Sequence, residues 1–168
     1  LVRPREGGGY EIIAGHRRQR ASELAGFVNM PCIVRNMTDD EGILAMTDDN
    51  LRHREKILPT EKAAALKQQV EAIKHQGGRL DGVAEGDIGK RSVEIVGENN
   101  GMNYKKVMRY IRLNSLVPEL LDKVDAKQMS FMPAVEISYI RPENQRLIAV
   151  SIDGEQSSPS VAQAKRLH

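Results

Sequence analysis

The chain has 168 residues and a formal net charge of +2, so it is long enough for one large domain or two small ones with a hydrophobic core, and it is not a general polycation. Only 4% of the residues are aromatic, and we expect helices that pack through aliphatic side chains. The single cysteine, Cys32, excludes an internal disulfide and a cysteine-rich zinc site, which fits a reducing cytoplasm. Because Cys32 lies in the apolar run PCIVR, we expect a buried structural thiol. No stretch reaches the roughly 18 apolar residues of a membrane-spanning helix.

Residues 10–21, YEIIAGHRRQRA, predict a binding site for a polyphosphate. The pattern is a short strand from Tyr10 to Ala14, a glycine, and a helix over about 16–26 that opens on arginines. A glycine lets the backbone approach a ligand, the unpaired N–H groups of a helix start point towards an anion, and guanidinium groups neutralise it. A strand–helix junction with a solvated basic face is the alternative that the pattern leaves open.

Two more strands and a capped helix are expected nearby. Residues 1–3 resemble the end of one strand, and residues 30–35 predict another. Thr38, with Glu41 three positions later, predicts a capping box for a helix that runs to about Leu51.

The end of this helix carries a candidate metal site. Asp49 and Asn50 stand side by side in the stretch DDNLRHRE, residues 48–55. Carboxylate and amide oxygens are hard donors that could hold Mg²⁺ beside a phosphate chain. A solvated helix end explains the same residues, and both interpretations stay open.

A longer amphipathic helix and a glycine-rich segment follow. Pro59 suits the first position of a helix that extends to about Gln76. Residues 77–91 are rich in glycine and predict a linker or loop. The apolar stripe of the helix is expected at Ala63, Leu66, Val70 and Ile73.

Residues 92–116 predict a helix–turn–helix. Such a motif needs a small residue where its helices touch, a turn glycine four positions later and a β-branched core residue six beyond that. Gly97, Gly101 and Val107 meet these requirements, and Asn103 is a good N-cap for the second helix. The first turns of a recognition helix are where it contacts base edges and phosphates. The outward residues of these turns are Tyr104, Lys105, Lys106 and Arg109. An amphipathic helix with a solvated basic face is the alternative. The rest of the chain predicts short helices that would pack around this segment, over about 116–124, 130–140, 142–152 and 160–167.

With both stretches located, the chain resembles the ParB family of chromosome and plasmid partition proteins along essentially its whole length. Gly15 to Ala21 (GHRRQRA) is similar to the family's GERRxRA box, and Asp49 to Arg54 (DNLRHR) to its ENxQR box. The third element is the helix–turn–helix followed by PELL at residues 118–121. The apolar, glycine-containing segment before the helix–turn–helix resembles the branch found on mobile elements of Gram-positive bacteria.

The resemblance implies a fold and a function. The fold is an α+β N-terminal ParB/sulfiredoxin-like domain over residues 1–76, a linker over 77–91 and an all-α helix–turn–helix domain over 92–168. In the family, CTP with Mg²⁺ closes a homodimer into a clamp that slides on double-stranded DNA carrying a palindromic, centromere-like site, and hydrolysis reopens it. An ATPase of the ParA type is the usual partner. We would expect a cytoplasmic, nucleoid-associated protein with no membrane partner.

The resemblance also assigns residues to sites by position. Asp49 and Asn50 would hold the metal and act in hydrolysis. The residues that would bind CTP are Gly15, His16, Arg17, Arg18, Arg20, Ala21 and Arg52. Those that would contact DNA are Lys90, Arg91, Asn103, Tyr104, Lys105, Lys106, Arg109 and Arg112.

Two departures from the family pattern bear on these roles. His16 and Asp49 each stand where the family usually has Glu, and the shorter Asp49 carboxylate could fall out of reach of the metal, so hydrolysis is expected less firmly than binding. The family's first nucleotide motif would precede Leu1, and its dimerisation domain would follow His168. We therefore expect a piece of a longer protein that binds DNA as a weak dimer and nucleotide poorly.

Two other functions stay open. One is a helix–turn–helix transcriptional regulator without nucleotide switching. The other is a metal-dependent nuclease with Asp39, Asp40, Asp48 and Asp49 as ligands, although these acids lack a second cluster at suitable spacing. Sulfiredoxin, which shares the N-terminal fold class, has a catalytic cysteine after its glycine; here His16 follows Gly15, so that redox chemistry is not expected.

Overall fold

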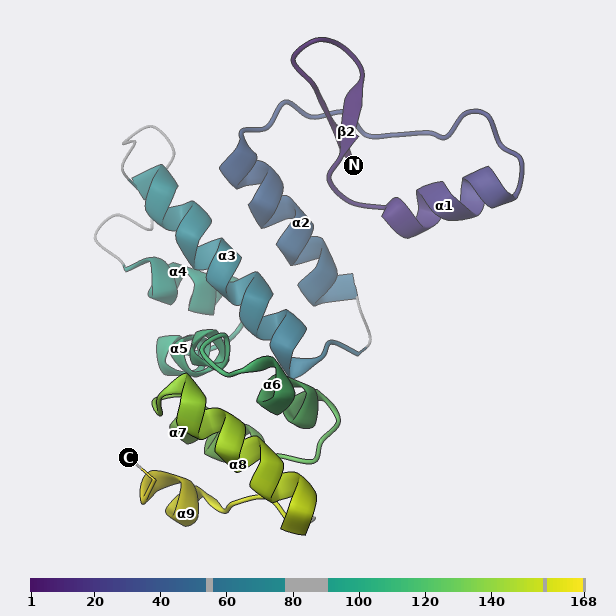
Figure 1. Ribbon diagram of the computed structural model, residues 1–168. Coiled ribbons are helices and arrows are strands. Elements are labelled where there is room, and N and C mark those ends of the chain that lie inside the picture. The colour runs from purple at the N-terminus through teal and green to yellow at the C-terminus, as the bar shows by residue number, and fades with distance from the viewer. Residues whose placement is uncertain (54–55, 78–90, 156, 168) are drawn as a thin grey trace.

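A small antiparallel sheet lies at one end of a mostly helical molecule in the computed structural model, which describes residues 1–53, 56–77, 91–155 and 157–167 (Figure 1). Strands β1 (Val2–Pro4) and β2 (Tyr10–Ile12) pair with Val2 opposite Ile12 and Pro4 opposite Tyr10. The chain then turns through Gly15 into the first helix. The predicted strand at 10–14 is confirmed over its first three residues.

The segment over residues 30–35, predicted as a strand, forms one isolated parallel bridge between Val2 and Val34 instead. Pro31 has no N–H to donate to a sheet, and the Cys32 thiol donates to the Met30 carbonyl of its own segment at 3.5 Å. The expectation of a buried thiol is wrong for the same reason, since without a strand to cover it Cys32 is exposed.

Local signals place the helix starts where the sequence predicts them. The Thr38 N–H donates to the Glu41 carboxylate at 2.8 Å, and the Glu41 N–H donates to the Thr38 hydroxyl at 3.3 Å, which is the expected capping box. Pro59 begins the third helix as predicted. The helices of the described residues are α1 (His16–Leu24), α2 (Asp39–His53), α3 (Pro59–Gly77), α4 (Ser92–Asn99), α5 (Tyr104–Leu113), α6 (Pro118–Asp125), α7 (Phe131–Ile137), α8 (Pro142–Glu155) and α9 (Val161–Lys165).

Helix α3 joins two hydrophobic clusters. Leu66 and Val70 of α3 pack with Val96 of α4 and Val107 of α5 in one cluster. The other gathers α5 to α9, and Ala63 of α3 belongs to it. The predicted stripe along α3 is therefore confirmed, and each fully buried aliphatic side chain in it stabilises the fold by roughly 1.5–3 kcal/mol. Most of the predicted linker, residues 78–90, lies outside the described residues.

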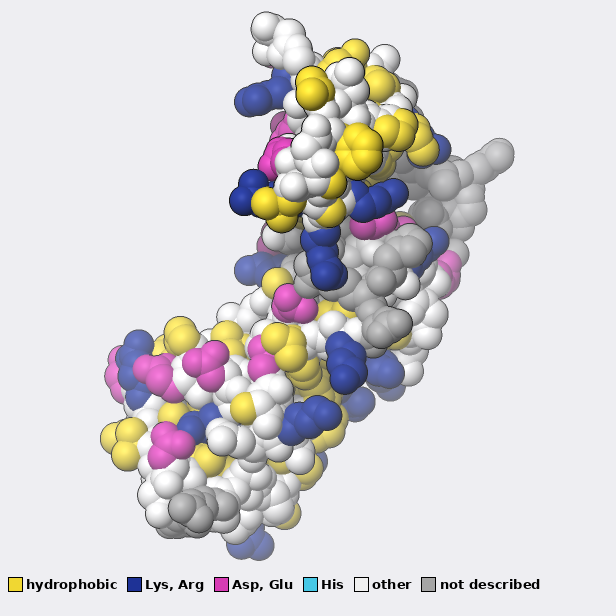
Figure 2. All heavy atoms as spheres, turned by 90° about the vertical axis from the view of Figure 1, so that its right-hand side faces the viewer, with side chains coloured by type: hydrophobic (Ala, Val, Ile, Leu, Met, Phe, Trp, Pro, Cys, Tyr) yellow, Lys and Arg dark blue, Asp and Glu magenta, His cyan; other side chains and the backbone are white. Residues whose placement is uncertain are grey.

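Helix α1 differs from the others, because none of its side chains is buried. It extends to one side of the molecule beyond β2 (Figure 1). Hydrophobic side chains gather on the surface of this end of the molecule (Figure 2), and the exposed ones of α1 and the segment after it include Leu24, Phe27, Val28 and Ile33. Within the described residues, no helix has the length and apolar character that crossing a membrane requires.

Candidate functional site

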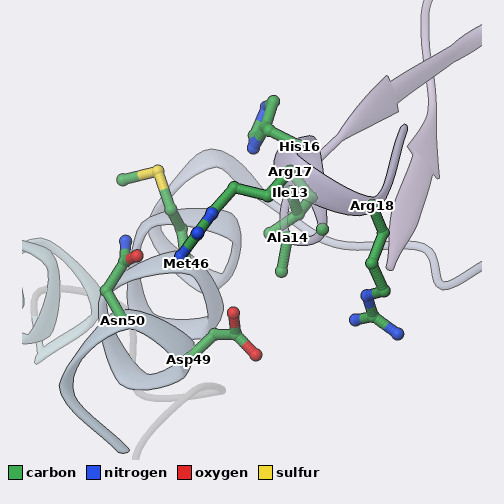
Figure 3. Close-up of a pocket in the computed structure, with 9 residues that line it drawn as sticks. Ile13, Ala14, His16, Arg17, Arg18, Met46, Asp49 and Asn50 are labelled. Atoms are coloured by element: carbon green, nitrogen blue, oxygen red, sulfur yellow. The ribbon is translucent and has the colours of Figure 1, made fainter. Parts of the chain in front are cut away.

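A cleft of about 610 Å³ opens between the start of α1 and the C-terminal half of α2 (Figure 3). It brings together the two stretches that the sequence singled out. One wall is formed by Ile13, Ala14, Gly15, His16, Arg17 and Arg18. The other wall is formed by Met46, Asp49 and Asn50.

Gly15 sets the geometry of the basic wall. It is the N-cap of α1 and has a φ of 103°, in the left-handed region that favours glycine. It offers no side-chain cap, and the first turn of α1 contains no acidic side chain. The N–H groups of that turn therefore meet the cleft together with the positive end of the helix dipole, an arrangement suited to an anion.

The arginines of the first turn point in different directions. Figure 3 shows the Arg17 side chain reaching across the cleft towards Met46 and Asn50, whereas Arg18 leaves the helix on the other side. Arg17 is thus the cation that spans the two walls. Its guanidinium can donate to an anion held between the α1 start and α2.

Three residues expected to bind nucleotide do not line this cleft. Arg20 pairs with Glu23 at 3.2 Å on the exposed side of α1. Arg52 pairs with Asp48 at 3.0 Å. Ala21 lines the neighbouring, more apolar pocket, to which Cys32 also contributes.

Asp49 and Asn50 are placed to meet a ligand, but the surrounding acids do not form a metal cluster. Among the described residues, no three His, Cys, Asp or Glu side chains come together in a way that could hold a metal ion. Asp48 is held by Arg52, and Asp39 pairs with Arg3 at 2.7 Å, so the four acids of the nuclease hypothesis are dispersed. A single carboxylate is still compatible with Mg²⁺, which usually keeps several waters and binds through one or two carboxylates and the phosphates of its nucleotide.

The α4–α5 pair has the close contact and the turn that the sequence predicts. A Cβ on Gly97 would lie 2.6 Å from the Met102 carbonyl oxygen, so only glycine fits there. Gly101 turns the chain with a φ of 63°, and Val107 is fully buried. The Asn103 side chain accepts a hydrogen bond from the Lys106 N–H at 2.8 Å, as expected for an N-cap.

The polar face of α5 is exposed at Lys105, Lys106 and Arg109. Of the other residues predicted to contact DNA, Arg112 and Arg91 have partners within the protein, and Lys90 is not among the residues that the structure describes. Arg112 donates to the Ser138 carbonyl at 2.7 Å and lies 4.2 Å from the Tyr139 ring, which ties α5 to the end of α7.

Arg91 is also held within the protein. Its guanidinium pairs with Glu94 at 2.7 Å and lies 4.9 Å from the centre of the Tyr104 ring, across the starts of α4 and α5. Hydrogen bonding to the Glu94 carboxylate raises the pKa of Arg91 above its ordinary value. Arg91 therefore fixes the position of Tyr104 at the head of α5.

Sequence reasoning missed two residues of α3 that contact this part of the molecule. Gln69 is buried and bonds to both Asp48 of α2 and Asn100 of the α4–α5 turn. Lys62 lies over the ring of Tyr110 on α5. A polar residue that interrupts the apolar stripe, as Gln69 does beside Val70, is a usable signal, whereas nothing in the sequence distinguishes Lys62.

Comparison with known proteins identifies the relatives of the chain. Residues 1–51 match the family model of the ParB N-terminal domain. The chain is a relative of the ParB proteins. It is 29% identical to the chromosome-partitioning protein Spo0J of Thermus thermophilus over 86% of its length, and 29% identical to the probable chromosome-partitioning protein ParB of Vibrio cholerae over 93%. It spans about half the length of these relatives, 46% and 47% respectively.

The fold is ParB-like. A C-terminally truncated ParB from Caulobacter crescentus, solved in complex with the centromeric parS site, superimposes with a TM-score of 0.60 and 23% identity. The superposition covers 99% of this chain and 79% of that one. The small sheet and the many helices that follow it are therefore features of a ParB-like fold.

Proposed function

We propose that this chain is part of a DNA-binding partition protein that uses CTP and Mg²⁺ as a switch. The observation that carries the proposal is the cleft in which the basic start of α1 faces Asp49 and Asn50. In this assignment, Gly15 and the N–H groups of α1 approach the phosphates, Arg17 neutralises them from across the cleft, and Asp49 and Asn50 supply oxygen donors to the metal.

The α4–α5 pair is the proposed helix–turn–helix. Lys105, Lys106 and Arg109 would meet phosphates and base edges, with Tyr104 positioned by Arg91. Two copies of the chain would bind the two halves of a palindromic site, and association with the nucleoid follows from DNA binding. The clamp cycle and the ParA-type ATPase partner belong to the same proposal and are supported by the kinship with partition proteins.

Hydrolysis of CTP would also require the Asp49 carboxylate to reach the metal ion. The Asp49 carboxylate is one methylene shorter than the usual glutamate, so it must approach the metal more closely through the position of α2. We expect binding of CTP to be weak but measurable, and its hydrolysis to be slow. The metal-dependent nuclease is not favoured by the dispersed acids of the described residues.

The proposal is tested by calorimetry with CTP, ATP, GTP and UTP in the presence of Mg²⁺. We expect selective binding of CTP, and a loss of at least about tenfold in affinity in Arg17→Ala, because a hydrogen bond to a charged group is worth about 1.5–3 kcal/mol. Arg20→Ala is the matched control, since Arg20 lies on the same helix but pairs with Glu23 outside the cleft. Binding of CTP to Arg17→Ala with the wild-type affinity would contradict the proposed nucleotide-binding site. A protein that binds DNA tightly but no nucleotide would be a helix–turn–helix regulator.

A further inference from the structure

A lysine of α3 stands against the flank of α5 that carries the half-buried Tyr110. The Lys62 ammonium lies 5.3 Å from the centre of the Tyr110 ring. Tyr110 and Lys106 are four residues apart on α5, and residues at this spacing share a face of a helix. Lys62 and Lys106 are therefore neighbours across two helices that are far apart in the sequence.

The positive charge of Lys106 disfavours the charged form of Lys62. The pKa of Lys62 is lowered, first by its partial burial and second by the positive charge of Lys106. In the part of the chain that the structure describes, neither lysine has an ion-pair partner, whereas Lys67 on the same helix is 4.0 Å from the Glu71 carboxylate. An anion placed between Lys62 and Lys106 would remove this repulsion and attract both charges.

We propose that Lys62 and Lys106 together hold one phosphate group of the DNA backbone, so that α3 is part of the DNA interface. The inference rests on the proposed function, in which α5 lies on DNA. A polyanion is the occupant that the surroundings favour, because exposed Lys105 and Arg109 continue the positive surface along α5. Since Lys62 approaches from the flank of α5, its contact fixes the orientation of that helix on the duplex and carries no base preference.

The test measures the affinity for a duplex that carries a centromeric parS site and for an unrelated duplex over a range of salt concentrations. We expect Lys62→Gln to weaken binding to both duplexes by the same factor and to reduce the slope of log K against log salt by about one. Lys62→Arg is expected to keep the wild-type slope. Lys67→Gln is the matched control on α3 and should leave both affinity and slope unchanged, because the Lys67 charge is paired with Glu71.

The outcomes separate a phosphate contact from a structural role. Loss of affinity with an unchanged salt slope would mean that Lys62 only supports Tyr110, and wild-type affinity in Lys62→Gln would remove Lys62 from the interface; either result overturns the inference. If the wild-type protein binds neither duplex, the proposed function itself fails, and the inference fails with it.

A second measurement tests the pair without DNA. NMR titration of the protein with isotopically labelled lysines reports the pKa of Lys62 directly. We expect that pKa to rise in Lys106→Gln, because a neighbouring positive charge has been removed, and to stay unchanged in Lys105→Gln. An unchanged pKa in Lys106→Gln would show that the two ammonium groups do not share a site and would overturn the inference.

Discussion

At the scale of single residues, two helical glycines give a matched pair of variants, because Gly97 is closely packed and Gly154 faces open space. In Gly97→Ala the new methyl group would lie 2.6 Å from the Met102 carbonyl oxygen, so α4 and the turn must move apart. We expect the free energy of unfolding to fall by about 1–3 kcal/mol, the usual cost of overpacking, and DNA affinity to fall with the displacement of α5.

The control is Gly154→Ala in α8, where a Cβ would meet no other atom within 4 Å. Alanine is favoured over glycine inside a helix by about 1 kcal/mol or less, so this variant should be neutral or slightly more stable. Urea unfolding of both variants measures the difference. Equal stabilities would show that the contact at Gly97 has room for a methyl group and does not require glycine.

Residues whose role is local could be predicted from the sequence, and those whose role depends on a distant partner could not. Gly97 and Asn103 act on neighbours in the same motif, so their spacing predicts them. Arg112 was predicted to be another cation of the proposed DNA-binding helix, but its partner Ser138 comes from the end of α7. Arg20 belongs to the same arginine-rich stretch as Arg17, yet its position on the helix turns it towards Glu23 and away from the cleft.

At the scale of the secondary-structure elements, one buried side chain links three of them. Gln69 of α3 is 3% exposed; it donates to the Asp48 carboxylate of α2 at 3.2 Å and accepts from the Asn100 side chain at 2.8 Å. Asn100 also donates to the Val96 carbonyl at the end of α4, at 2.8 Å. The position of α4 against α2 and α3 is therefore specified by hydrogen bonds as well as by apolar packing.

We expect Gln69→Leu to lower the free energy of unfolding by about 1–3 kcal/mol, because leucine fills the space but leaves Asp48 and Asn100 without this partner. Gln68→Leu is the control, since Gln68 is exposed on the same helix and its replacement should change stability by no more than about 0.5 kcal/mol. Thermal unfolding of the two variants is the measurement. A Gln69→Leu protein as stable as Gln68→Leu would show that the buried hydrogen bonds contribute no net stability.

The elements themselves were predicted unequally well. Helix starts depend on a few adjacent residues, and the capping box at Thr38, the proline at 59 and the cap at Asn103 were all found from the sequence. The strand over residues 30–35 was not, because a strand requires a partner along its whole length and only Val34 obtains one, with Val2. Apolar composition alone does not supply that partner.

At the scale of the whole molecule, the sequence predicted that the cleft residues would meet, since both stretches carry recognisable boxes. It did not predict that α3, assigned to the first domain, contributes side chains to the cores on both of its sides. An amphipathic stripe shows that a helix is buried but does not identify the elements that cover it. The position of the cleft relative to α5, the proposed DNA-binding helix, therefore could not be predicted from the sequence.

The absence of any buried side chain in α1 has a consequence for how the protein would respond to the proposed nucleotide. A helix of nine residues with no buried side chain is marginal in water, because nucleation is costly and few hydrogen bonds follow it. We expect amide hydrogens of α1 to exchange with solvent much faster than those of α3, and CTP with Mg²⁺ to slow exchange in α1 selectively. Exchange in α1 that is already as slow as in α3 would contradict this expectation. If α1 is only partly formed without ligand, its folding equilibrium lowers the apparent affinity and makes the order of this helix a direct readout of nucleotide occupancy.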